Sequence, residues 1–593
     1  MKFFSQVEKT ETLLVLFGLC FVILGWFALS LTLASLFLMP LLVIGFVLVG
    51  ALSIFIGIKL FTHTPIDFRV VFLIAILYAA LIGFYSEPTV FSGRDQGSIA
   101  EAAFQLAHNG QLAFSTPGSK SFFQVYGPGT ALNFPGFAYT REGDLITAFP
   151  LGYTAWLATF VTFFGIHGLA IGNGILLFLF LLTLYALLRL FVHPTYALYG
   201  FALAAFSFLP TWFAKITLTE NFCVFLFTFL VYNLILFLRE GKFICYVGIL
   251  LTAGLFAFTR LEGFAFLIIA LIVMFWSEHT RNIWKTYPWK SIALPGVVFT
   301  FFFLRDFFLN LPYYKVAGKG LFKFAGDAGN DTLLQTGAAA LGSVFFLYGL
   351  LVLFVVGLFG ILVFLKERRY ILLLPALIAL PTFVYLFSPN ITLDHPWMLR
   401  RYLFSLFPAL LFSAVIGIAI LFARDKSFPI EKPQGKRYFF VSIIFLSLLF
   451  LQYPAWSTGL TYADNRTLLK QVSAFSQEFS NNDLILIDRF ATGSGFAMLS
   501  GPAQFLYGKN TVYFFNPSDL GKIDLSHFDH TYLLVPEDSL GRYTATFGSR
   551  LVFKKSIDFT LEQFESLSLT ETTDLRLPEK TSLVTHDLLF QIY

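Results

Sequence analysis

Long apolar runs separated by short polar turns fill the first 455 residues of this 593-residue chain. A transmembrane helix needs about 20 predominantly apolar residues, and thirteen segments approach that length. These segments are residues 11–33, 36–58, 69–86, 167–190, 196–214, 220–238, 243–260, 263–277, 291–309, 338–365, 370–387, 402–423 and 437–455. The pattern predicts a polytopic α-helical membrane protein with about 13 transmembrane helices.

Composition agrees with a membrane protein. The mean hydropathy is +0.75, and only 13% of the residues are charged, against about 25% in soluble domains. All three cysteines lie inside apolar stretches, which is typical of inert core residues. The net charge of +5 comes from loop lysines and arginines, so no nucleic-acid partner is expected. The first apolar run leads directly into a second and is predicted to be a membrane anchor, not a cleaved signal peptide.

The placement of Lys and Arg predicts the orientation, because cytoplasmic turns carry an excess of both residues. With the N-terminus inside, every turn on that side is basic. These turns hold Lys59 and Arg69; Arg189; Arg239 and Lys242; Arg281, Lys285 and Lys290; Lys366, Arg368 and Arg369; Arg424, Lys426, Lys432, Lys436 and Arg437. The assignment requires that residues 147–165 do not cross, so we interpret them as an interfacial or re-entrant helix. Residues 87–147, 211–220, 310–337 and 388–401 then face outside.

The composition changes after residue 455. Residues 456–593 are polar and net acidic, and they contain a helix-like segment at 464–479. Short apolar segments at 484–487, 511–515 and 532–535 are typical of strands. Alternating helix and strand predicts a small α/β domain on the outer side. We therefore divide the chain into a transmembrane domain, 1–455, and a soluble extracytoplasmic domain, 456–593.

Asp95 is the main candidate for chemistry. It opens loop 87–147 in the run Ser-Gly-Arg-Asp-Gln-Gly, and the residues that follow, up to Asn109-Gly110, predict a short amphipathic helix on the membrane surface. A helix N-terminus favours an anion, so we expect Asp95 to be ionised, as a general base requires. Alternatively Asp95 caps the helix, and the two roles are compatible.

Other charged residues gather at the outer ends of the predicted helices. Charges at membrane depth are usually paired or functional. The local pairs Lys215–Glu220 and Arg260–Glu262 could simply secure helix ends. Arg400 and Arg401 are adjacent and are predicted to lie outside, where the positive-inside bias disfavours arginine. A phosphate is the natural partner for two such guanidinium groups. Alternatively, the two side chains snorkel to lipid headgroups.

A metal site has little support from the sequence. His108 and His395 could in principle ligate a metal together with Asp95 or Glu101. No spacing typical of metal ligands accompanies them, so no metal is assigned.

Several motifs occur in an order that resembles the GT-C glycosyltransferases, in particular the bacterial protein O-mannosyltransferase-like and aminoarabinose-transferase-like families. The motifs are Gly93-Arg94-Asp95-Gln96-Gly97, Phe149-Pro150-Leu151-Gly152-Tyr153, Thr217-Leu218-Thr219-Glu220, Thr259-Arg260-Leu261-Glu262-Gly263, and Arg401-Tyr402-Leu403 with Pro408. The resemblance covers most of residues 85–410. Those families often carry a second carboxylate where this chain has Gln96, which makes a metal-dependent scheme less expected.

The resemblance implies transfer of a sugar from a polyprenyl-phosphate-linked donor to a lipid, glycan or protein acceptor. It implies inversion, with Asp95 as general base, at the outer face of a bacterial inner (plasma) membrane. The implied donor-phosphate ligands are Arg400, Arg401, Lys215 and Arg260. The implied substrate contacts are Arg94, Glu101, Glu220, Glu262, His395 and Tyr402. No cofactor is firmly implied. The alternatives are a transporter or flippase of lipid-linked sugars, a polysaccharide polymerase or ligase, and a non-catalytic assembly subunit.

Overall fold

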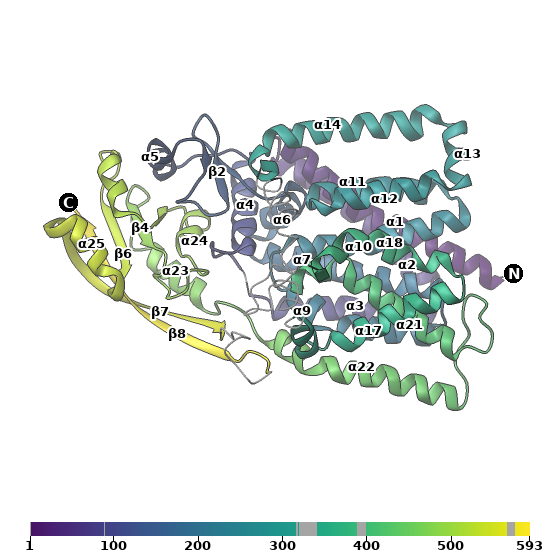
Figure 1. The fold of residues 1–593 in the computed structure, drawn as a ribbon. Helices are drawn as coiled ribbons and strands as arrows, with labels where there is room; N and C mark the ends of the chain where they lie inside the picture. The colour runs from purple at the N-terminus through teal and green to yellow at the C-terminus, as the bar shows by residue number, and fades with distance from the viewer. Residues whose placement is uncertain (1, 88, 316–317, 319–340, 388–398, 566–575) are drawn as a thin grey trace.

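The computed structural model describes residues 2–87, 89–315, 318, 341–387, 399–565 and 576–593. Figure 1 shows a bundle of long helices, with the N-terminus at one end and a smaller domain carrying the C-terminus beyond the other end. Loop 87–147 lies between the bundle and the C-terminal domain. The two regions that the sequence predicts on the outer side therefore lie together, at the end of the bundle opposite the N-terminus.

The bundle contains a helix in each of the thirteen segments predicted to cross the membrane. The longer helices are α1 (Lys2–Leu33), α2 (Met39–His63), α3 (Ile66–Phe84), α7 (His167–Arg189), α8 (Pro194–Ala205), α9 (Phe208–Ala214), α10 (Thr219–Glu240), α11 (Phe243–Thr259), α12 (Glu262–Phe275), α13 (Glu278–Thr286), α14 (Leu294–Leu309), α17 (Leu351–Lys366), α21 (Leu406–Phe422) and α22 (Lys436–Thr461). The shorter pieces are η1 (Trp289–Ala293), η2 (Tyr370–Leu373), α18 (Leu374–Ala379), η3 (Leu380–Phe383), α19 (Val384–Phe387) and α20 (Arg400–Leu403).

Length and hydropathy separate these helices into three groups. Among the described residues, seven helices are long and apolar enough to cross a membrane, or up to ten if three bent pairs each count as one span. The three remaining predicted segments contain the shorter apolar helices 243–259, 370–386 and 406–422. The polytopic helical class is confirmed, and the count of 13 crossings stays a prediction.

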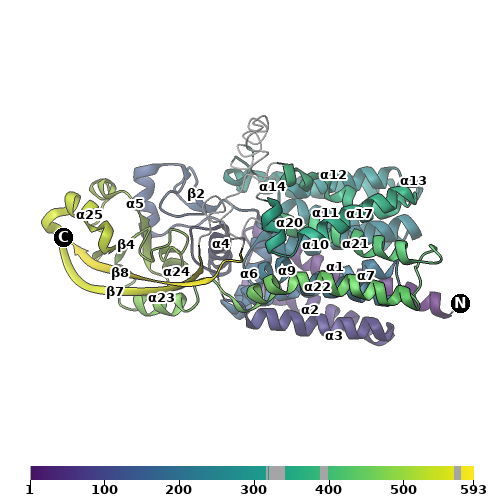
Figure 2. The ribbon, with the colours of Figure 1, turned by 60° about the horizontal axis from the view of Figure 1, so that its bottom comes forward.

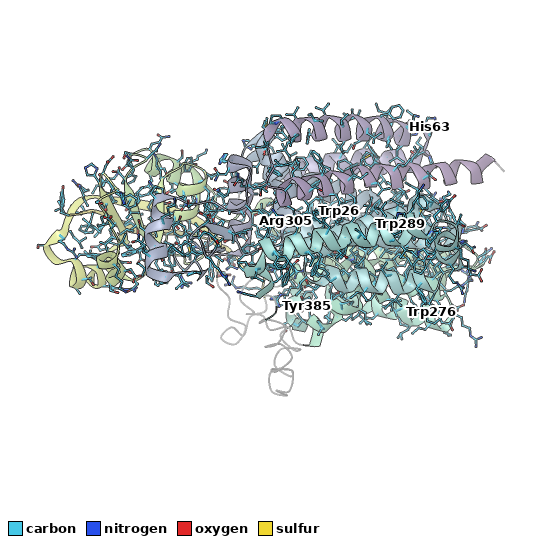
Figure 3. All side chains as sticks on the ribbon, turned by 90° about the horizontal axis from the view of Figure 1, so that it is seen from above. Trp26, His63, Trp276, Trp289, Arg305 and Tyr385 are labelled. Atoms are coloured by element: carbon cyan, nitrogen blue, oxygen red, sulfur yellow. The ribbon has the colours of Figure 1, made fainter. Side chains whose placement is uncertain are left out.

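Two exposed tryptophans lie toward the end of the bundle near the N-terminus. Figure 3 shows Trp276 and Trp289 there, and both indole rings are largely exposed. Arg305 and Tyr385 lie toward the opposite end, which faces the C-terminal domain. Tryptophan is enriched at the membrane–water interface, so these two indoles are placed as interfacial anchors.

Loop 87–147 folds into a compact unit of helices and strands. It contains α4 (Asp95–Asn109), α5 (Pro117–Tyr126) and an antiparallel sheet in the order β1 (Gly129–Thr130), β2 (Phe137–Tyr139), β3 (Leu145–Thr147). The predicted helix after Asp95 is confirmed, and Gly110 ends it in the left-handed conformation, at φ 69°. However, α4 does not lie free on a surface, because every residue from Gln96 to Leu106 is buried.

Helix α4 is buried because it packs between two other elements. One is α6 (Leu151–Phe164), and the other is α24 (Ser500–Phe505) of the C-terminal domain. At 1.5 Å per residue, the 14 residues of α6 span roughly 21 Å, less than the roughly 30 Å of a bilayer core. A helix of this length suits the prediction that residues 147–165 do not cross.

The C-terminal domain is built on a five-stranded sheet in the order β5-β4-β6-β8-β7. Strands β4 (Leu484–Asp488), β5 (Asn510–Phe514) and β6 (Thr531–Pro536) are parallel and correspond to the predicted strands. The long antiparallel pair β7 (Leu551–Phe564) and β8 (Lys580–Ile592) was not predicted. Helices α23 (Leu468–Ser476), α24 and α25 (Leu540–Phe547) complete the domain.

Aromatic packing joins the C-terminal domain to the bundle. Helix α22 runs six residues past the predicted boundary, to Thr461, and leads straight into Tyr462. The Tyr462 ring lies 3.8 Å from the Phe564 ring and 5.5 Å from the Trp212 ring, centroid to centroid. Figure 2 shows β7 and β8 reaching from the C-terminal domain toward this end of the bundle.

Candidate active site

Asp95 lies at the start of α4, after a tight turn. Arg94 takes the N-cap position, and no side-chain capping hydrogen bond forms there. A Cβ atom on Gly97 would lie 1.7 Å from the carbonyl oxygen of Phe91, so the turn that presents Asp95 requires glycine at this position. The Asp95 carboxylate makes an ion pair with Arg400, and in this structure it does not serve as a helix cap.

Five charged side chains form a continuous series of ion pairs, which we call the charge chain: Asp95, Arg400, Glu220, Arg260 and Glu262. Arg400 Nη2 lies 2.6 Å from Asp95 Oδ2, and Arg400 Nε lies 3.6 Å from Glu220 Oε1. Arg260 Nη1 lies 2.8 Å from Glu220 Oε1, and its Nε lies 3.0 Å from Glu262 Oε2. The charge chain thus brings together α4, α10, the α11–α12 turn, the start of α12 and α20.

Exposure is uneven along the charge chain. The Glu220 side chain is 1% exposed, whereas the Asp95 side chain is 46% exposed. Arg260, Glu262 and Arg400 lie between these extremes. Asp95 is therefore the open end of a mostly buried set of charges, and it is the member most accessible to solvent.

Aromatic residues support the arginines. The Arg260 guanidinium lies 4.7 Å from the centroid of the Phe404 ring, and the Arg401 guanidinium lies 5.4 Å from that of Tyr385. The Tyr385 hydroxyl donates to Glu262, and the Tyr402 hydroxyl donates to the Tyr385 carbonyl at 2.9 Å. Among the residues that the structure describes, no carboxylate pairs with Arg401, which leaves its charge available to an anionic ligand.

Three predicted site residues contact other partners. Lys215 Nζ donates to the carbonyl oxygens of Gly459 and Leu460 at 3.0 and 2.8 Å, and also to that of Tyr462. It thereby satisfies carbonyls at the C-terminal end of α22, where the bundle passes into the C-terminal domain.

The other two face the C-terminal domain, and one predicted residue cannot be placed. The Arg94 guanidinium lies 4.1 Å from the centroid of the Phe496 ring. Glu101 is buried against Gly501. His395 falls outside the described residues.

Some residues of the site were not anticipated from the sequence. Tyr385 and Phe404 contact Glu262, Arg401 and Arg260, but the chain has 25 Tyr and 78 Phe residues. Aromatic residues this frequent carry no positional signal. Only a neighbouring charge could have singled these out, as Arg400 and Arg401 do for Phe404.

Comparison with known proteins finds similar structures but no similar sequence. No family model matches the chain, and no curated protein matches it. ArnT from Cupriavidus metallidurans bound to undecaprenyl phosphate is similar at 10% identity, over 88% of this chain and 97% of that one, with a TM-score of 0.49. The apo oligosaccharyltransferase of Archaeoglobus fulgidus is similar at 13% identity, over 87% and 76%, with a TM-score of 0.48. At these identities the likeness concerns the fold alone, and it assigns this chain neither a family nor an activity.

Proposed function

We propose that this chain is an integral membrane glycosyltransferase that moves a sugar from a polyprenyl-phosphate-linked donor to an acceptor hydroxyl or amine, with Asp95 as general base. The observation that carries the proposal is the position of Asp95. It is the exposed end of a buried charge chain that contains Arg400 and Arg260, and it pairs directly with Arg400. Such an arrangement suits a reaction that needs one base and cations for a leaving phosphate.

The chemistry assigns a role to each end of the site. The acceptor attacks the anomeric carbon, and its proton passes to the Asp95 carboxylate. The bond from the anomeric carbon to the phosphate oxygen breaks, and its electron pair stays on the phosphate. Direct displacement inverts the anomeric centre, through an oxocarbenium-like transition state that a nearby carboxylate stabilises.

The leaving phosphate is placed with Arg401 and Arg400. A guanidinium offers several donors in a planar fork that fits a phosphate. Arg401 has no carboxylate partner among the described residues, and Arg400 contacts Asp95 through Nη2 and Glu220 through Nε. When a phosphate binds Arg400, it competes with Asp95 for Nη2 and releases the carboxylate to accept the acceptor proton.

Glu220 and Glu262 do not touch the reacting groups and instead position the arginines. Glu220 pairs with both arginines of the charge chain, and Glu262 pairs with Arg260. These buried carboxylates balance the positive charge and fix the arginine side chains before substrate arrives. Such preorganisation avoids reorganisation during the reaction.

The test is Asp95→Asn, compared with Asp144→Asn in the same loop. Purified protein in liposomes is given a panel of radiolabelled polyprenyl-phosphate hexoses and pentoses, and transfer and donor loss are measured. We expect Asp95→Asn to lower the rate roughly 10²–10⁴-fold, the usual contribution of a general base. Asp144→Asn should transfer at the wild-type rate. A folded Asp95→Asn protein with normal transfer would remove Asp95 as the base.

One observation favours a second candidate, a transporter of lipid-linked sugars. A cavity of about 760 Å³ opens at the other end of the bundle, lined among others by Glu11, Arg189, His193 and Lys432. A cavity of this size, with charged side chains in a largely apolar lining, could admit a headgroup. Movement of a fluorescent polyprenyl-phosphate sugar across liposomes separates the two functions, because a transporter would move it in the Asp95→Asn protein as well.

A further inference from the structure

The residues just before Asp95 are held by the C-terminal domain. The Met498 amide donates to the Ser92 carbonyl at 3.1 Å, and the two residues form an antiparallel bridge. A Cβ atom on Gly93 would lie 2.8 Å from the Gly495 carbonyl oxygen. With Arg94 lying over Phe496, each of the three residues before Asp95 contacts the segment 495–498.

The C-terminal domain also contacts the middle of α4, at Glu101. Glu101 lies six residues after Asp95, roughly 9 Å along the helix axis, and is 1% exposed. It faces Gly501, where an added Cβ atom would lie 1.7 Å from Glu101 Oε1 and 2.6 Å from Ser92 Oγ. Only glycine at position 501 allows α24 to approach α4 this closely.

The interface around Glu101 is polar and nearly closed. Glu101 Oε1, Ser92 Oγ, Asn133 Oδ1 and Gln504 Nε2 are all buried at this interface. They line a cavity of about 10 Å³, which is the size of a site for one water molecule. Burial raises the pKa of Glu101 well above its usual range, so we expect its carboxyl to be neutral and able both to donate and to accept.

We propose that residues 495–501, which we call the clamp, position Asp95 for catalysis, and that Glu101 acts through the clamp as a positioning residue and not as a substrate contact. The clamp contacts the chain on both sides of Asp95, at Ser92–Arg94 and at Glu101. Asp95 itself is nearly half exposed and pairs with Arg400 on one side only. Its place in the site therefore depends on how the backbone of the turn is held.

The inference rests on the proposed function, and its consequence is a specific kinetic defect. Displacing a reacting group by about 1 Å can lower a rate roughly 10²-fold. A loosened clamp moves Asp95 but leaves Arg401 in place on the bundle. Donor affinity should therefore be kept while turnover falls.

The experiment is Gly501→Ala in the full-length protein, with Gly541→Ala in the same domain as the control, because a Cβ atom there meets nothing within 4 Å. Hydrogen–deuterium exchange of residues 92–102 and the kcat and KM for the lipid-linked donor are both measured. We expect Gly501→Ala to speed exchange and to lower kcat 10- to 100-fold with KM within twofold. The double variant Gly501→Ala with Glu101→Ala, which makes room for the new methyl group, should recover part of the lost kcat.

Two results would overturn the clamp: unchanged exchange in Gly501→Ala, or a rise in KM with kcat intact. A fall in thermal stability with normal exchange and kcat would also contradict the proposal, because it would show that the Gly501–Glu101 contact only stabilises the fold. If the wild-type protein transfers no sugar, the proposed function fails. In that case hydrogen–deuterium exchange of residues 92–102 in Gly501→Ala still tests whether the clamp holds the turn before Asp95.

Discussion

Glu220 gives the sharpest test of the charge chain. The substitution Glu220→Gln keeps the shape of the side chain and removes one negative charge, 2.8 Å from Arg260 and 3.6 Å from Arg400. At 1% exposure, water cannot replace the lost charge. Removing one partner of a buried ion pair costs about 3–5 kcal/mol, because the remaining charge stays buried without compensation. Each 1.4 kcal/mol changes an equilibrium constant tenfold. The ratio of folded to unfolded protein should therefore fall roughly 10²- to 10⁴-fold.

The matched control is Glu367→Gln. Glu367 makes an ion pair of similar length, 2.6 Å to Lys426, but the two side chains are 26% and 44% exposed. Exposed pairs contribute little, so this variant should unfold as the wild type does. Thermal unfolding of both variants in the same detergent, at matched protein concentration, gives the comparison.

A second substitution tests the same ion pairs. Glu220→Gln leaves two arginines facing each other, so the additional substitution Arg400→Met should restore part of the lost stability. Equal and small losses for Glu220→Gln and Glu367→Gln would refute the view that Glu220 is the buried centre of the charge chain. A double variant less stable than the sum of its single variants would do the same.

Three more predictions follow from single residues. Arg401→Ala should raise KM for the donor at least tenfold with little change in thermal unfolding, because Arg401 lies ready for a phosphate and holds no carboxylate among the described residues; direct binding of polyprenyl phosphate checks this. Lys215→Met should lower stability by roughly 2–4 kcal/mol, because three buried carbonyls lose a charged donor, and thermal unfolding measures the loss. Burial raises the pKa of Asp587 to about 7, so its contribution to stability is fully present below about pH 4 and is lost as pH rises through 7; Asp587→Asn should remove this slope between about pH 4 and 7 in thermal unfolding.

The sequence predicted the helices well because apolar length alone decides which segments enter a membrane. Segment 370–387 is the instructive exception. It has the right composition, but the structure divides it into η2, α18, η3 and α19, a break that hydropathy does not detect. In the C-terminal domain, the apolar strands β4 to β6 were visible, whereas β7 and β8 were missed because polar and charged residues interrupt both.

The charge chain was partly predictable for a related reason. Charges are so scarce in this chain that Asp95, Glu220, Arg260 and Arg400 stand out, and scarce charges at membrane depth must pair. Lys215 could not be assigned in this way, because its partners are backbone carbonyls, which no residue type reveals. The contact of Glu101 with Gly501 joins positions 400 residues apart and was equally hidden.

The charge chain also bears on how the protein is made. Asp95 leaves the ribosome about 300 residues before Arg400, which at 5–20 residues per second is roughly 15–60 s. Glu220 gains its partner Arg260 after only 40 more residues. Asp95 must wait for Arg400. The last charge is therefore matched only after α20 is synthesised. Until then only solvent can compensate the Asp95 carboxylate, so the charge chain is complete only once residue 400 has been added.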